Sequence, residues 1–275
     1  MSVRCAVTTL AAGSRVLPPE ASHYLCRVLR LGRGDRFVAF DPASRLEADA
    51  SVEEASGGAA RVSIGEPRAA AVLAGARITL VYAHAKGDKV DAVVRDATEL
   101  GATRILIART ERAVAKAVGD RQDAKLGRWR RIAEQAARQC GRADPPDVGG
   151  VLAWKDALEA AAKDAEARYC LWEQATEPLA GTLLDRVRAG SALAFAVGPE
   201  GGLAESEVLE ARALGFAAVS IGRFVLRTET VPAAVLGAVR ILEGTPPSSA
   251  HLGQHGEGFS EKISDGSTVD DRVTK

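Results

Sequence analysis

The residues best suited to chemistry lie in a glycine-rich loop at positions 198–202, with the sequence Gly-Pro-Glu-Gly-Gly. The loop follows an apolar segment at 192–197, which predicts a buried strand, and precedes a predicted helix at 205–214. Glycines let a ligand lie against the backbone, and a loop before a helix often binds phosphate. Glu200 would repel a phosphate, and the spacing fits neither the P-loop nor the dinucleotide-binding pattern. The loop therefore suits a ligand with hydroxyl or amine groups; a simple strand-to-helix turn is the alternative.

A second polar loop, at positions 221–230, again lies between a predicted buried strand and a predicted helix. Its sequence is Ile-Gly-Arg-Phe-Val-Leu-Arg-Thr-Glu-Thr. Arg227 and Glu229 could act on a substrate, or they could simply pair with each other. Thr230 is predicted to cap the following helix through its side chain.

The elements that must position these loops change in character near residue 76. Residues 1–72 combine short β-rich segments with glycine and proline turns, which predicts a small barrel interrupted by one helix at 23–31. Over residues 77–245 apolar strands alternate with amphipathic helices. This alternation predicts an α/β fold, with a mainly parallel sheet and a ligand site beyond the carboxyl ends of its strands. Residues 246–275 are predicted to be disordered.

Charge is unevenly distributed in a chain whose formal net charge is zero. Residues 77–142 carry 15 basic and 8 acidic side chains, whereas residues 143–245 carry 9 and 15. A basic block attracts nucleic-acid phosphates, but a solvated arginine-rich helix explains it equally well. No signal peptide or bilayer-spanning apolar run is evident, so a cytoplasmic protein is expected. The four cysteines lack zinc-ligand spacing, so no metal is expected.

Taken together, the two loops resemble those of the RsmE family, the ribosomal small-subunit uridine-N3 methyltransferases of the SPOUT superfamily. The resemblance covers residues 4–243 in order. Small departures occur at Val225 and Val231, where the family usually has isoleucine and alanine, and neither touches a charged group. The other matching positions are 23–30, 34–35, 86–89, 98–101, 110–112, Glu134, Gln139 and Arg142.

The resemblance implies an architecture, a cofactor and a substrate. The architecture is an N-terminal PUA-like β-barrel at 1–72, which binds RNA, and a C-terminal SPOUT domain at 77–245 with a deep trefoil knot, acting as a homodimer. The cofactor is S-adenosylmethionine, and the substrate is 16S rRNA, free or in the assembled 30S subunit. The residues implied to line the cofactor are Glu173, Val197, Gly198, Glu200, Gly201, Gly202, Ile221, Gly222, Leu226 and Thr228.

Methylation at uridine N3 defines the catalytic roles. N3 carries a proton and is a poor nucleophile until that proton leaves, and negative charge then builds on the flanking carbonyl oxygens. We expect Arg227 or Arg112 to stabilise this charge and Glu229 or Glu200 to act as the base. The target uridine must be unpaired or flipped out. The arginines expected to contact RNA are Arg27, Arg30, Arg138 and Arg142, with Arg128, Arg130 and Arg131 on the same predicted helix.

Two other functions stay open at this point. One is a SPOUT methyltransferase that acts on transfer RNA or on a ribose 2'-hydroxyl, since only the resemblance of residues 226–230 favours uridine N3. The other is an RNA-binding protein without catalysis, which the intact glycine-rich loops disfavour. A hydrolase or a zinc enzyme is disfavoured because the chain has no G-x-S-x-G, no H-E-x-x-H and no cysteine cluster.

Overall fold

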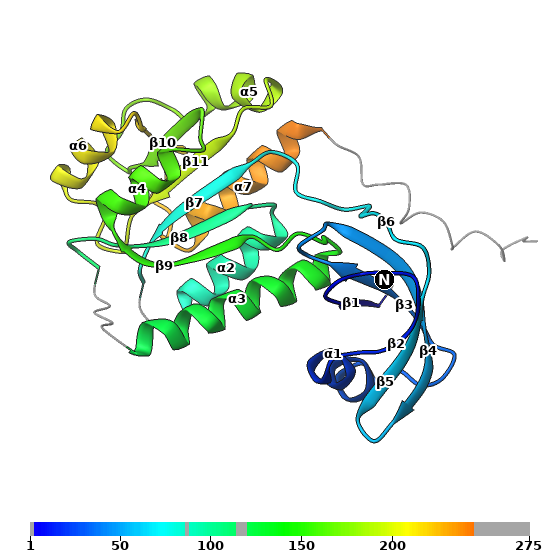
Figure 1. Ribbon diagram of the computed structural model, residues 1–275. Coiled ribbons are helices and arrows are strands. Elements are labelled where there is room, and N and C mark those ends of the chain that lie inside the picture. Colours follow the sequence, from blue (N-terminus) through cyan, green and yellow to red (C-terminus); the bar gives the residue numbers. More distant parts are fainter. Residues whose placement is uncertain (1–2, 86–87, 114–119, 245–275) are drawn as a thin grey trace, which may run out of the picture.

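The computed structural model describes residues 3–85, 88–113 and 120–244, which form two sheets joined by helix α3 and a linker (Figure 1). The predicted disordered tail at 246–275 lies outside the described residues. The N-terminal sheet is mixed: β1 pairs with β3 in parallel, and its other ladders are antiparallel, in the order β1-β3-β4-β5-β2 with β6 on β4. Its strands are β1 (Arg4–Ala6), β2 (Gly13–Val16), β3 (Arg36–Asp41), β4 (Leu46–Ser56), β5 (Ala59–Ile64) and β6 (Arg68–Ala69).

The helical segment of the N-terminal part begins earlier than the sequence predicts. Helix α1 (Pro19–His23) starts at a proline, whose fixed φ and missing N–H suit a first helical turn. It continues directly into η1 (Tyr24–Val28), which has π-helical hydrogen bonding. Leu25 of this segment is fully buried and packs against the sheet, among Phe37, Val52 and Val62.

The second sheet has six parallel strands in the order β12-β10-β11-β7-β8-β9. The prediction of a mainly parallel α/β fold is therefore confirmed for this part. All six residues of β7 are buried, as expected for a strand covered on both faces. The strands are β7 (Ile78–Ala83), β8 (Arg104–Arg109), β9 (Asp147–Ala153), β10 (Ala167–Leu171), β11 (Leu193–Val197) and β12 (Ala217–Val219).

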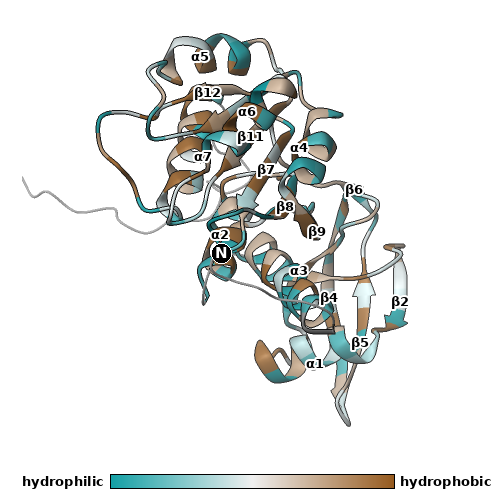
Figure 2. Ribbon diagram, turned by 90° about the vertical axis from the view of Figure 1, so that its left-hand side faces the viewer, coloured by the Kyte–Doolittle hydropathy of each residue, from teal (hydrophilic) through white to brown (hydrophobic). Residues whose placement is uncertain are grey.

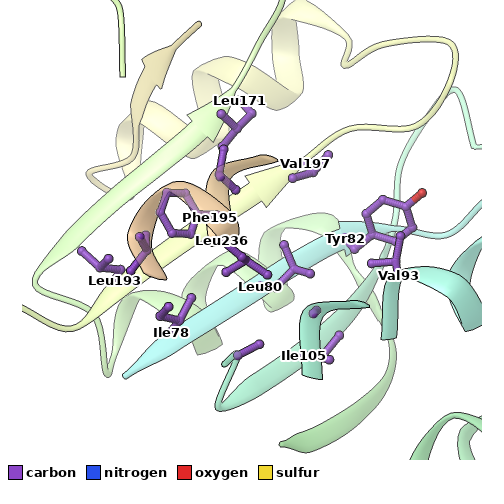
Figure 3. Packing of buried hydrophobic residues seen from close by; sticks show 14 of the residues in the cluster. Ile78, Leu80, Tyr82, Val93, Ile105, Leu171, Leu193, Phe195, Val197 and Leu236 are labelled. Carbon is purple, nitrogen blue, oxygen red and sulfur yellow. The ribbon is translucent and has the colours of Figure 1, made fainter. Parts of the chain in front are cut away.

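Helices cover both faces of this sheet, and alternate residues of its strands pack against them. On one face, Ile78, Leu80 and Tyr82 of β7 belong to one buried cluster with α2 and α7; Figure 3 shows Leu236 of α7 beside Leu80, and Val93 of α2 beside Tyr82. On the other face, Val81 packs with Phe216 and Leu158. Figure 2 shows hydrophobic segments in brown on β8, β9 and α7 in this interior. Helices α2 (Lys89–Glu99), α3 (Asp120–Cys140), α5 (Ala180–Arg188) and α7 (Thr230–Glu243) supply the first face, and α4 (Trp154–Ala162) and α6 (Glu205–Ala213) the second.

Arg142, which follows α3, connects the end of this helix to the segment between α2 and β8 and, through Asp144, to the linker. Its side chain is 3% exposed and donates to the carbonyls of Thr98 at 2.8 Å and Ala102 at 2.9 Å, and to Asp144 at 3.0 Å. Asp144 in turn accepts from the backbone N–H of Ala74 in the linker. Because the guanidinium is buried among protein acceptors, the expectation that Arg142 contacts RNA phosphates is wrong for this conformation.

We expect Arg142→Ala to lower the free energy of unfolding by about 2–4 kcal/mol, because it leaves Asp144 and two buried carbonyls without their donor. Urea unfolding measures this change. Arg131→Ala, an exposed arginine on the same helix, is the control and should stay within about 0.5 kcal/mol of the parent. Equal stability of the Arg142 variant and the parent would contradict the assigned role.

Candidate active site

A cavity of about 540 Å³ lies where β10, β11 and β12 end. Its walls come from the segments that follow these strands, because parallel strands present their carboxyl ends at one edge. The structure thus brings together all ten residues that the sequence assigned to cofactor binding, and Arg227 and Glu229 with them. The ten are Glu173, Val197, Gly198, Glu200, Gly201, Gly202, Ile221, Gly222, Leu226 and Thr228.

The glycines of the first loop are required by close packing. A Cβ on Gly198 would lie 2.8 Å from Cγ of Leu203. Gly202 has φ +70°, in the left-handed region, and a Cβ there would lie 2.7 Å from Oε1 of Glu173. Glu173 therefore reaches from the end of β10 across to this loop, and the left-handed backbone of Gly202 favours a residue without a Cβ at that position.

The buried side chain of Thr228 joins the two loops. Its Oγ1 donates a hydrogen bond of 2.5 Å to the carbonyl of Gly198. Thr230, by contrast, does not cap helix α7 through its side chain. It is the first helical residue, Glu229 occupies the cap position, and the Thr230 N–H bonds the Arg227 carbonyl at 2.8 Å. The prediction of a Thr230 side-chain cap is therefore wrong.

Lys89 is a site residue that the sequence reasoning did not single out. Its Nζ lies 2.9 Å from Oε1 of Glu200 and 3.3 Å from Oε2 of Glu229, so it bridges the two loops. The hydrogen bond to Glu200 raises the pKa of Lys89, with Glu229 adding to the effect. Glu229 pairs with this lysine, and no ion pair joins it to Arg227 among the described residues. The neighbouring lysine and glycine of the matched motif, 86–87, lie outside the described residues.

Tyr82 lies at the end of β7 close to this charged cluster. Its side chain is fully buried, and Figure 3 shows its ring beside Val93 of α2. Burial raises the pKa of Tyr82 to about 12; the side chain of Thr228 lowers it in part, and Glu200 and Glu229 add to the rise. The phenol therefore stays neutral and adds no charge to the site at neutral pH.

Arg112 supports the first loop from outside the cavity. It follows β8, and its Nη1 donates to the carbonyl of Gly201 at 3.2 Å and contacts that of Leu203 at 3.5 Å. The cavity lining includes Arg227 but not Arg112. Of these two candidates, Arg227 is therefore the one that a ligand in the cavity would meet.

Three of the arginines expected to contact RNA lie near the N-terminal sheet. Arg27 and Arg30 are exposed on and after η1. The guanidinium of Arg138 lies over the ring of Tyr24, 4.5 Å from its centroid, and so joins α3 to η1. These three remain accessible, or partly so, whereas Arg142 does not.

The part of the chain that the structure describes lacks two kinds of feature. No group of three or more histidine, cysteine or acidic residues there could hold a metal ion. No helix in the same residues is both long and apolar enough to cross a membrane.

Comparison with known proteins assigns the class. A family model described as "RNA methyltransferase domain" matches residues 74–240, which includes both loops and all of the parallel sheet. The fold, the cavity and this match define an RNA methyltransferase.

Relatives identify the particular family. "Ribosomal RNA small subunit methyltransferase E" of Mycobacterium tuberculosis is 34% identical over 86% of this chain and 89% of its own length. The protein of the same name from Synechocystis is 32% identical over 80% of this chain and 70% of its own. A crystal structure of the Neisseria gonorrhoeae protein of that name, bound to S-adenosyl methionine, is 28% identical with a TM-score of 0.77, over 88% of this chain and 98% of that one. The chain belongs to the ribosomal RNA small subunit methyltransferase E family, and the resemblance found in the sequence is confirmed.

The geometry of the first loop can be tested by substitution. We expect Gly202→Ala to cost about 1–2 kcal/mol of unfolding free energy, because φ +70° strains any residue with a Cβ. Thermal and urea unfolding measure it. Glu173→Ala combined with Gly202→Ala should not recover the loss, since the flexible carboxylate can move aside while the strain persists.

The matched control for this substitution is Gly127→Ala, in α3, where an added Cβ meets open space. That change should raise stability by up to about 1 kcal/mol. If Gly202→Ala were as stable as the parent, the strained loop geometry would be refuted.

Proposed function

We propose that this protein uses S-adenosylmethionine to methylate N3 of a uridine in 16S rRNA of the small ribosomal subunit. The observation that carries the proposal is the cavity at the strand ends, where both loops and all ten expected cofactor residues meet. Family membership supports the reaction class, and the related structure bound to S-adenosyl methionine supports the cofactor. Since the substrate is ribosomal RNA, we place the protein in the cytoplasm.

The residues of the cavity fit this cofactor. A cavity of about 540 Å³ has the size of an ordinary small-molecule site. Val197, Ile221 and Leu226 give apolar walls suited to an adenine, and the carboxylates of Glu173 and Glu200 suit hydroxyl and ammonium groups. When bound, S-adenosylmethionine supplies an electrophilic methyl group.

The chain's own residues would act on the nucleotide. Arg227 lines the cavity and is exposed, so its guanidinium can stabilise charge on the uridine carbonyls. Glu229, at the start of α7, is the candidate acceptor of the N3 proton. Arg112 would not contact the base; instead it would hold the first loop in place through its hydrogen bond to the Gly201 carbonyl.

The finer architecture is also a proposal. We infer that the segments 198–202 and 221–230 are tied in a deep trefoil knot, with 77–245 forming a SPOUT domain. The bond from Thr228 to Gly198, which links the loops across β10, supports this inference. We infer that residues 1–72 form a PUA-like barrel that binds RNA through Arg27 and Arg30, with Arg138 of α3 next to them; the exposure of Arg27 and Arg30 beside the sheet supports this inference.

A homodimer is proposed from an exposed apolar segment beside the cavity. Phe224 is 76% exposed and Val225 is 82% exposed, and both line the cavity. Large apolar side chains this exposed on one loop are unusual on a monomer and suit a contact with a second copy. Such a contact would also close the cofactor site.

The function is tested by methyl incorporation into small subunits purified from a strain that lacks the gene. We expect 3-methyluridine, identified by nucleoside mass spectrometry, with wild-type protein. Arg227→Ala should lower kcat about 10²- to 10³-fold, because a charge-stabilising donor is lost. Arg186→Ala, an exposed arginine on α5, is the control and should match wild type. Methylation of transfer RNA, or at a ribose hydroxyl, would refute the proposed substrate.

The dimer is tested by sedimentation equilibrium. Phe224→Asp with Val225→Asp should convert the protein to a monomer, because two charges would be buried in an apolar contact. Ile241→Asp is the matched control: Ile241 is equally exposed, on α7, but lies outside the cavity lining. A monomeric wild type, or a double variant that remains dimeric, would rule out this interface.

A further inference from the structure

Lys89 is the single cation that contacts carboxylates from both loops among the described residues. It is the first residue of α2, and its Nζ reaches Glu200 at 2.9 Å and Glu229 at 3.3 Å. All three side chains line the cavity. One ammonium thus connects the helix to the loop after β11 and to the segment that begins α7.

Stability alone does not explain a lysine at this position. The N-terminus of a helix carries partial positive charge, which disfavours a cation there. The three side chains are each a quarter to a third exposed, and ion pairs in contact with solvent contribute little to stability. A residue that breaks a local preference without a stability gain is expected at functional sites.

The charges around Lys89 show what its removal would do. Among the described residues, Lys89 contacts the carboxylates of Glu200 and Glu229, and Tyr82, the titratable group supplied by β7, is neutral because its pKa is about 12. The pKa of Lys89 is raised by its hydrogen bond to Glu200, so the ammonium keeps its proton at neutral pH. Without this ammonium, the Glu229 carboxylate would lose an opposite charge 3.3 Å away, and an opposite charge at that distance favours the charged form of an acid.

We propose that Lys89 is a positioning residue for proton removal: it holds Glu229 as a carboxylate beside the cavity and uses Glu200 as its second anchor. This inference rests on the proposed function. In the step concerned, the N3–H bond of the uridine breaks and its electron pair stays on N3. The proton forms an O–H bond with the Glu229 carboxylate and later passes to water. Lys89 keeps its own proton throughout.

The first test is the dependence of kcat on pH in the methylation assay. In Lys89→Met the acidic limb of the profile should move up by about 1–3 pH units, because an opposite charge next to the base is lost. The variant should therefore lose more activity than wild type as the pH falls and recover as the pH rises. Lys89→Arg keeps the charge and should keep the limb close to its wild-type position. An unmoved limb in Lys89→Met would overturn the proposal.

Two comparisons separate this role from others. Lys155→Met is the matched control, since Lys155 forms an exposed ion pair with Glu159 on α4 away from the cavity; its profile should equal that of wild type. If Lys89→Met instead raised KM for the subunit and left both kcat and the limb unchanged, Lys89 would contact RNA phosphates, and the proposal would be wrong.

The second test needs no methyl transfer. Carbon-13 NMR of protein labelled at glutamate side-chain carboxyl carbons follows their titration, and Glu229→Gln and Glu200→Gln assign the two signals. In Lys89→Met at least one of the two should titrate at higher pH than in wild type, and in Lys89→Arg neither should. Unchanged titration would overturn the inference even in an active enzyme. A wild type that binds cofactor but methylates no ribosomal RNA would refute only the proposed function. The NMR titration would still show whether Lys89 keeps these carboxylates ionised.

Discussion

The bond from the Thr228 hydroxyl to the Gly198 carbonyl is the contact on which the site depends. The two residues lie in loops that follow β12 and β11, and β10 separates these strands in the sheet. A buried hydroxyl must find an acceptor, so this donor fixes the second loop against the first. With the loops held together, the Glu229 carboxylate that starts α7 comes within reach of Lys89 on α2. The cavity walls and the charged cluster both follow from this one attachment.

The parallel sheet was predictable because its strands are continuous apolar runs between amphipathic helices, and the structure reproduces them with small shifts in bounds. The N-terminal sheet was harder to predict. Its longest strand, β4, has the sequence Leu-Glu-Ala-Asp-Ala-Ser-Val-Glu-Glu-Ala-Ser, which is rich in residues with low strand propensity. Pairing with β3 and β5 on its two sides makes this segment a strand, and such long-range pairing leaves little local signal.

For the site, the two loops after buried strands were recognisable in the sequence as a local pattern, and the resemblance to the RsmE family implied which of their residues line the cavity. It missed Lys89, because the role of this lysine depends on two carboxylates more than a hundred positions away in the sequence. The only local signal for a site there was the group of charged residues around Asp88. It misassigned Arg142, because charge on a helix end does not reveal whether the side chain turns inward. Burial and pairing across the fold are tertiary properties that residue type does not encode.

Helix α3 contacts both halves of the molecule. Near its start Lys125 lies 3.4 Å from His84 at the end of β7, and near its end Arg138 lies on Tyr24 of η1. Thirteen residues separate these two contacts, which is about 20 Å of α-helix. Because a helix does not stretch, α3 fixes the distance between the end of β7 and η1. A ligand that contacted both halves of the molecule would have to span this fixed distance, so its three-dimensional shape would matter as much as its chemistry.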